Sequence, residues 1–66
     1  MTTVHYYLDA KPPRQTLLRR ADYVDEAFVA GKWQPTKAIV DFMFGHNDWV
    51  DEISEDRARR VAPTAF

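Results

Sequence analysis

The sequence predicts a small α+β fold, in which two or three short antiparallel strands pack against a central helix and a second helix follows at the C-terminus. Three observations support this prediction. Residues 4–9 alternate in the manner of a half-buried strand. Residues 38–44 are apolar at six of seven positions and end at a glycine. Ser54 precedes two acidic residues, as at the start of a helix.

The length and composition restrict the class of protein. Sixty-six residues with 45% hydrophobic content make one compact domain spanning residues 1–66, and a domain of this size buries only about 60% of its unfolded surface. The chain has no cysteine, which suits a reducing cytoplasm. It has no apolar run of membrane-spanning length and no signal-peptide pattern at its start. We therefore expect a cytoplasmic protein with no membrane contact.

The first element expected is a strand over residues 4–9. Val4, Tyr6 and Leu8 would share one face, and the residues between them would share the other. Tyrosine and valine favour a pleated, half-buried surface. Pro12 and Pro13 then remove two backbone donors, so the segment 11–14 is expected to be a loop.

Residues 16–31 support two interpretations. A helix would begin after Thr16 and end at Gly31, with apolar residues spaced four, three and four apart on one face. A hairpin would instead run from Tyr23 to Val29 and turn at residues 30–32 into Trp33. We favour the hairpin because the glycine lies between two aromatic residues at a natural turn position.

The central helix is expected from Pro35 to Phe44. Ile39, Phe42 and Met43 form one apolar stripe, and Val40 and Phe44 form a second. A helix that is apolar on several sides requires cover on several sides. One stripe would lie on the sheet, and so small a chain has little material left to cover the other.

The remaining elements follow from local signals. Residues 45–48 have turn chemistry, and residues 49–53 are expected to be extended. Ser54 is a suitable N-cap for a last helix, because its hydroxyl can accept a hydrogen bond from a backbone N–H of the first turn. Pro63 ends that helix, and residues 63–66 are expected to form a flexible tail.

Three segments carry a resemblance to other proteins: residues 31–36 (GKWQPT), residues 44–48 (FGHND) and residues 52–58 (EISEDRA). In these segments the second half of the chain resembles small uncharacterised proteins of actinobacteria and their phages. The resemblance implies a bacterial or phage origin. It implies no activity.

One cluster of residues could bind a metal ion. His46, Asp48, Asp51 and Glu52 place one imidazole and three carboxylates within seven residues. A catalytic metal site normally takes ligands from different elements, whereas these four share one loop. Asp51 and Glu52 are also unsuited to act as an acid and base pair, because neighbours on a strand point to opposite faces. We expect no metal, no cofactor and no enzymatic activity.

The favoured function is protein interaction, as a regulatory module that binds a partner protein or a second copy of itself. The doubly apolar helix supplies Val40 and Phe44, and two tryptophans flank it in the sequence. Tryptophan is enriched at the energetic centres of interfaces, although in a small domain it also fills the core. The candidate interface residues are Trp33, Val40, Phe44 and Trp49.

The alternative function is nucleic-acid binding. Arg14, Arg19 and Arg20 lie in the first third of the chain, with tyrosines close by that could stack on bases. Against this, ten acidic residues outnumber nine basic ones, and no recognition motif is visible.

The opposite electrostatic character marks the second half of the chain. From residue 38 to residue 56 there is no lysine or arginine, and there are six acidic residues. A folded protein with an acidic face can bind a basic groove on another protein, since such electrostatics speed association and select partners. The acidic residues are Asp41, Asp48, Asp51, Glu52, Glu55 and Asp56.

Overall fold

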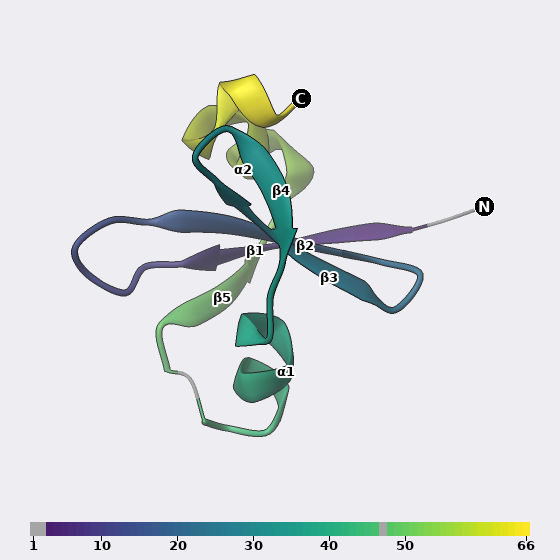
Figure 1. The fold of residues 1–66 in the computed structure, drawn as a ribbon, viewed down its shortest axis with the longest axis vertical. Coiled ribbons are helices and arrows are strands. Elements are labelled where there is room, and N and C mark those ends of the chain that lie inside the picture. The colour runs from purple at the N-terminus through teal and green to yellow at the C-terminus, as the bar shows by residue number, and fades with distance from the viewer. Residues whose placement is uncertain (1–2, 47) are drawn as a thin grey trace.

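The computed structural model describes residues 3–46 and 48–66, which form a five-stranded antiparallel sheet with short helices (Figure 1). The spatial order of the strands is β4-β3-β2-β1-β5, so the first four form a meander and the fifth returns beside the first. The strands are β1 (Val4–Asp9), β2 (Thr16–Ala21), β3 (Val24–Val29), β4 (Lys32–Pro35) and β5 (Val50–Ile53). The helices are α1 (Ala38–Met43), α2 (Glu55–Val61) and the 3₁₀ helix η1 (Pro63–Ala65).

The predicted fold class is wrong, because the sheet and not a central helix is the dominant element. Residues 16–21 form strand β2, where the sequence suggested either a helix or no regular element. The segment expected as a central helix supplies only the six residues of α1. Pro35 pairs with Glu26 at the end of β4, so the chain is still extended where the helix was expected to begin.

The strand prediction for residues 4–9 is confirmed, and so is the hairpin that ends near Trp33. The hairpin turns at Ala30 and Gly31, whose φ angles are +53° and +77°. Two consecutive positive φ angles are the signature of the two-residue turn that matches the twist of paired strands. The β2–β3 connection repeats this geometry at Asp22 and Tyr23, with φ angles of +51° and +67°.

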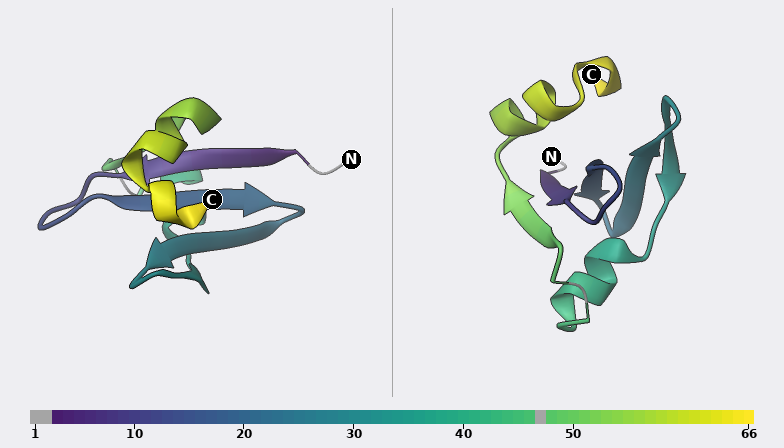
Figure 2. Two further views of the ribbon diagram at one scale, coloured as in Figure 1. Left: turned by 90° about the horizontal axis from the view of Figure 1, so that it is seen from above. Right: turned by 90° about the vertical axis from the view of Figure 1, so that its left-hand side faces the viewer.

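The sheet is buried on both faces, by a different helix on each (Figure 2). Tyr7 belongs to the cluster that includes Ile39 of α1, and its neighbour Tyr6 belongs to the cluster that includes Ala58 of α2. Consecutive strand residues point to opposite faces, so burial of both requires cover on both sides. We call these the α1 face and the α2 face.

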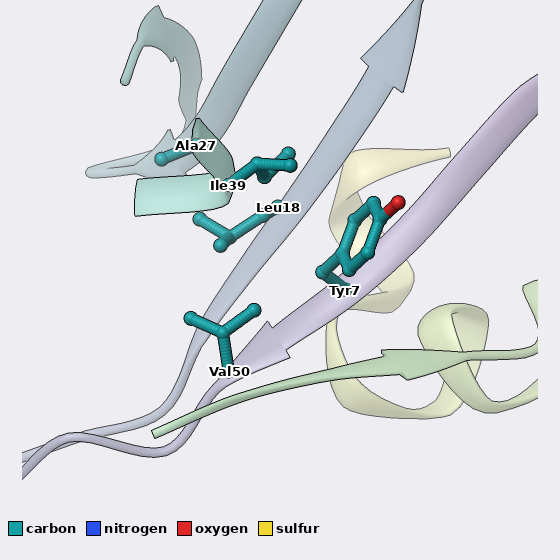
Figure 3. Packing of buried hydrophobic residues seen from close by; sticks show 5 residues of the cluster. All are labelled: Tyr7, Leu18, Ala27, Ile39 and Val50. Atoms are coloured by element: carbon teal, nitrogen blue, oxygen red, sulfur yellow. The ribbon is translucent and has the colours of Figure 1, made fainter. Parts of the chain in front are cut away.

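The core on the α1 face lies where the three central strands meet the helix (Figure 3). Leu18 of β2 lies between Tyr7 of β1 and Ala27 of β3 in the strand register, and Ile39 covers them from α1. Val50 of β5 completes the cluster.

The helix ends follow local chemistry. Ser54 caps α2 as predicted, since its Oγ accepts a hydrogen bond from the backbone N–H of Arg57 at 3.2 Å. At the start of α1 the Oγ1 of Thr36 accepts from the N–H of Ala38 at 3.2 Å. Gly45 ends α1 with a φ of +77°, a conformation that favours glycine.

The C-terminal residues lie against the α2 face. Pro63 follows the end of α2, and residues 63–65 form η1 where a flexible tail was expected. The centre of the Phe66 ring lies 5.4 Å from the centre of the Tyr6 ring. The guanidinium of Arg59 lies over the Phe66 ring, 4.6 Å from its centre.

Asn47, in the predicted 45–48 turn, lies outside the described residues. Within the described chain, no helix is long and apolar enough to cross a membrane.

Candidate protein-interaction surface

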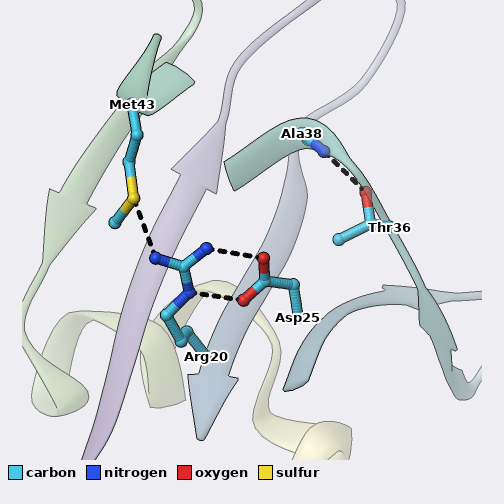
Figure 4. Close-up of polar contacts among 5 residues, drawn as sticks. All are labelled: Arg20, Asp25, Thr36, Ala38 and Met43. Carbon is cyan, nitrogen blue, oxygen red and sulfur yellow. Dashed lines mark hydrogen bonds and ion pairs between the residues drawn. The ribbon is translucent and has the colours of Figure 1, made fainter. Parts of the chain in front are cut away.

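An ion pair on the α1 face connects the sheet to the C-terminal end of α1 (Figure 4). Arg20 donates two hydrogen bonds to the carboxylate of Asp25, from Nε at 2.5 Å and from Nη2 at 2.7 Å. Its Nη1 donates to the sulfur of Met43 at 2.8 Å. The hydrogen bond to Asp25 raises the pKa of Arg20 above its ordinary value. The two-pronged pairing fixes the guanidinium, which in turn holds Met43 beside the sheet.

The outer side of α1 carries apolar residues that the described part of the chain leaves partly or largely exposed. Val40 is 38% exposed and Phe44 is 74% exposed, whereas Ile39 on the inner side is fully buried. Residues 40, 43 and 44 have the spacing of one helix face. Trp49, in the connection that follows α1, is 49% exposed. Exposed apolar side chains gathered within one segment are typical of interaction sites, whereas isolated ones are ordinary.

Acidic residues accompany these apolar side chains. Asp41 and Asp48 are exposed within the same segment, and Lys11 and Lys37 lie outside it in the sequence. The segment from Val40 to Trp49 therefore contains two acidic residues and no lysine or arginine. We call this region the acidic–apolar surface and define it as Val40, Asp41, Met43, Phe44, Asp48 and Trp49.

The structure places one of the four candidate interface residues elsewhere. Trp33 lies on β4 at the α2 face, with its ring 5.2 Å from that of Phe28. The guanidinium of Arg19 lies 3.9 Å from the centre of the indole. Trp33 is half-buried there, and the sheet separates it from α1. Met43 belongs to the exposed residues instead. The sequence placed it in one stripe with Ile39 and Phe42, which suggested burial. Its contact with Arg20 has no local signal in the sequence.

The three arginines proposed for nucleic-acid binding do not form one patch. Arg19 and Arg20 are consecutive in β2, so they point to opposite faces of the sheet. Arg19 donates to Glu26 at 2.8 Å, and Arg20 is paired with Asp25 as described above. Arg14 is exposed in the loop between β1 and β2.

The described residues show no arrangement typical of a metal site or of a ligand pocket. In residues 3–46 and 48–66, no group of three or more histidine, aspartate or glutamate side chains could hold a metal ion. The same residues enclose no pocket. Asp51 and Glu52 point to opposite faces, because they pair with the consecutive residues Leu8 and Tyr7 of β1.

Tyr7 provides a pH-dependent test of the packing beneath this surface. Burial raises the pKa of its phenol above the ordinary value, and the negative charge of Glu52 raises it further. Above a pH of about 10 the unfolded chain loses this proton while the folded chain retains it, so stability falls as the pH rises. We expect urea unfolding to show a steeper loss of stability above this pH in the wild type than in Tyr7→Phe. Equal slopes would show that Tyr7 ionises as easily in the folded state as in the unfolded one.

The comparisons with known proteins add no relative. No protein-family model matches the chain, and neither the curated proteins nor the solved structures contain a match. The resemblance of residues 31–36, 44–48 and 52–58 to small proteins of actinobacteria and their phages therefore stays a prediction. Functional inference for this protein therefore rests on its own surface residues.

Proposed function

We propose that this protein is a small non-enzymatic interaction module that binds a basic surface of another protein through the acidic–apolar surface. One observation carries the proposal. Val40 and Phe44 remain exposed on a helix whose opposite side is fully buried, and the acidic residues beside them have no cation in the same segment. A partner that covers the apolar residues and neutralises the carboxylates would stabilise both features.

The apolar residues would supply most of the affinity. Aromatic residues at the centre of an interface, surrounded by a polar rim, carry a large share of binding energy. Phe44 and Trp49 provide such aromatic groups, and Asp41 and Asp48 provide the rim. The charges would mainly affect the association rate and the choice of partner, and their contribution would weaken with salt.

The charge favours a different protein over a second copy. A symmetric dimer built on this surface would bring the same acidic residues of two copies together, which costs energy. A basic partner has no such cost. Light scattering on a sizing column is therefore expected to give the monomer mass of 7.7 kDa over a wide range of concentrations.

The binding experiment compares two variants with the wild type. Val40→Ser combined with Phe44→Ser removes the apolar centre without touching the buried side of α1. Tyr23→Ser is the matched control, because Tyr23 is 99% exposed in the β2–β3 turn. Each immobilised protein is exposed to a lysate of an actinobacterium, as the resemblance suggests, and every captured protein is then purified and its binding measured by calorimetry.

We expect a partner with a basic surface that binds the wild type and Tyr23→Ser equally, binds the double variant at least about tenfold more weakly, and weakens with salt. A concentration-dependent dimer that the double variant abolishes would show that the surface binds a second copy. Partners that bind the double variant as tightly as the wild type would contradict the proposal.

A further inference from the structure

We propose that Met43 is a modification site, at which a peroxide oxidises the thioether to the sulfoxide and makes the acidic–apolar surface more polar. The inference rests on the proposed function, because it names a modification that would control binding at that surface. Two observations carry it: the exposure of Met43 and the contact between its sulfur and the guanidinium of Arg20.

Met43 is the reactive sulfur of this surface. The sequence contains two methionines, Met1 and Met43, and no cysteine that could react before them. Met1 lies outside the described residues. Met43 is 53% exposed at the last position of α1, so a small peroxide can reach this residue from solvent. Oxidation converts a flexible apolar side chain into a polar, chiral one, and it disrupts interfaces that contain methionine.

The reaction balances with a peroxide as the only other reactant. A lone pair of Sδ attacks one oxygen of the peroxide, so that an S–O bond forms and the O–O bond breaks. The leaving oxygen takes the electron pair of the broken bond, and the proton of the transferred oxygen passes to it through water. The sulfur is thereby oxidised by two electrons, and hydrogen peroxide is reduced to water.

Arg20 determines on which side of the sulfur the oxygen enters. A thioether sulfur has two lone pairs, and reaction at one or the other gives opposite epimers of the sulfoxide. Nη1 of Arg20 donates to the sulfur at 2.8 Å and so covers one lone pair (Figure 4). Two hydrogen bonds to the carboxylate of Asp25 fix the guanidinium, so the same lone pair is covered throughout the folded state. The folded protein should therefore form mainly one epimer.

The added oxygen would change the acidic–apolar surface and not the core. Met43 shares a helix face with Val40 and Phe44, whereas the buried contact of α1 is made by Ile39. The oxygen enters at the lone pair that Arg20 leaves free. A partner that covers the apolar side chains would have to remove water from this polar group, which costs free energy. Oxidation would therefore weaken binding while the fold persists.

The experiment uses the full chain, with hydrogen peroxide as the probe. The wild type is oxidised in the folded state and, as a reference without a fixed contact, unfolded in urea. Peptide mapping by mass spectrometry then measures the oxygen added at Met43 separately from that at Met1. The epimer ratio is measured on the digested peptides with two methionine sulfoxide reductases, each of which reduces one epimer.

Two variants separate the chemistry from the fold. Arg20→Lys keeps a cation for Asp25 but lacks the second nitrogen that contacts the sulfur. Met43→Leu keeps an apolar side chain of similar size that a peroxide does not oxidise. Urea unfolding checks the fold of both variants and of the oxidised wild type. Retention on a phenyl column compares their exposed apolar surface.

We expect the folded wild type to give a several-fold excess of one epimer. The unfolded wild type and folded Arg20→Lys should give nearly equal amounts of both. The oxidised wild type should unfold at nearly the same urea concentration as the untreated protein and should elute earlier from the phenyl column. Met43→Leu, treated in the same way, reports any contribution of Met1 and should shift less.

Three results would overturn the inference. Equal amounts of the two epimers in the folded wild type would show that Arg20 does not direct the reaction. Protection of Met43 in the folded state, under conditions that oxidise the unfolded chain, would show that it is not a modification site. Unfolding on oxidation would show that the thioether stabilises the fold, and that its oxidation does not act through the surface.

The outcomes also separate this inference from the proposed function. A captured basic partner should bind the oxidised protein several-fold more weakly and recover its affinity after reduction of the sulfoxide. A partner that is sensitive to the Val40→Ser and Phe44→Ser changes but indifferent to oxidation would contradict the inference and leave the proposed function in place. Oxidation of Met43 to one epimer, with no partner sensitive to Val40 and Phe44, would contradict the proposed function alone.

Discussion

Replacement of Leu18 by alanine is expected to lower the free energy of unfolding by about 3–5 kcal/mol. Leu18 is 1% exposed in the central strand β2 and packs with the buried residues of β1, β3, β5 and α1. Alanine would leave a cavity that this surrounding structure cannot close. A chain of 66 residues has a total stability of about 3–10 kcal/mol, so the loss would be a large part of the total.

Urea unfolding followed by circular dichroism measures this effect. The transition midpoint should fall steeply while the slope stays the same, because the surface exposed on unfolding changes little. Val29→Ala is the matched control: Val29 is also a strand residue of the α1 face, but it is exposed near the end of β3. A loss below about 1 kcal/mol is expected there. Equal losses at the two positions would contradict the packing described for β2.

Replacement of Ile39 by alanine is expected to cost about 2–4 kcal/mol and to release α1 from the sheet. α1 contains only six residues, and a helix so short is not stable by itself in water. Ile39 is the one residue of α1 that is fully buried, so it supplies the main contact that holds the helix in place. Amide hydrogen exchange should show that the backbone N–H of Asp41, which donates to the carbonyl of Lys37, loses protection in the variant.

The neighbouring residue provides the control for this prediction. Val40→Ala changes the exposed side of the same helix, and its expected cost is below about 1 kcal/mol with exchange protection retained. Loss of protection in both variants would show that α1 depends on its helical sequence and not on the contact of Ile39 with the sheet. The pair of variants thus separates the side of α1 that stabilises the fold from the side proposed to bind a partner.

The elements that the sequence predicted correctly are those with a complete local signal. Strand β1 alternates over six residues, Gly31 and Gly45 stand where the chain needs positive φ angles, and Ser54 caps α2. Each of these signals depends on residues within a few positions of one another. Local propensity, turn chemistry and capping act at that range, so they can be read without knowledge of the fold.

The candidate surface was predictable only in part, for a related reason. Val40 and Phe44 could be assigned to the outer side of a helix from their spacing alone. Met43 contacts Arg20, which is 23 residues earlier in the chain, and no local pattern in the sequence indicates this contact. The burial of Trp33 against Phe28 and Arg19 depends on which face of the sheet β4 presents to α2.

The sequence by itself determined the strand at residues 4–9, the glycine turns, the capped C-terminal helix and the two-sided apolar character of residues 38–44. Only the tertiary structure decided that residues 16–21 form a strand and that the central helix is reduced to Ala38–Met43. The physical reason is burial on both faces. Leu17 and Leu18 are both buried because a different helix covers each side of β2, which removes the alternation that marks a strand in a sequence. Pairing between distant segments, such as β1 with β5, then fixes an edge strand that no local pattern specifies as an edge.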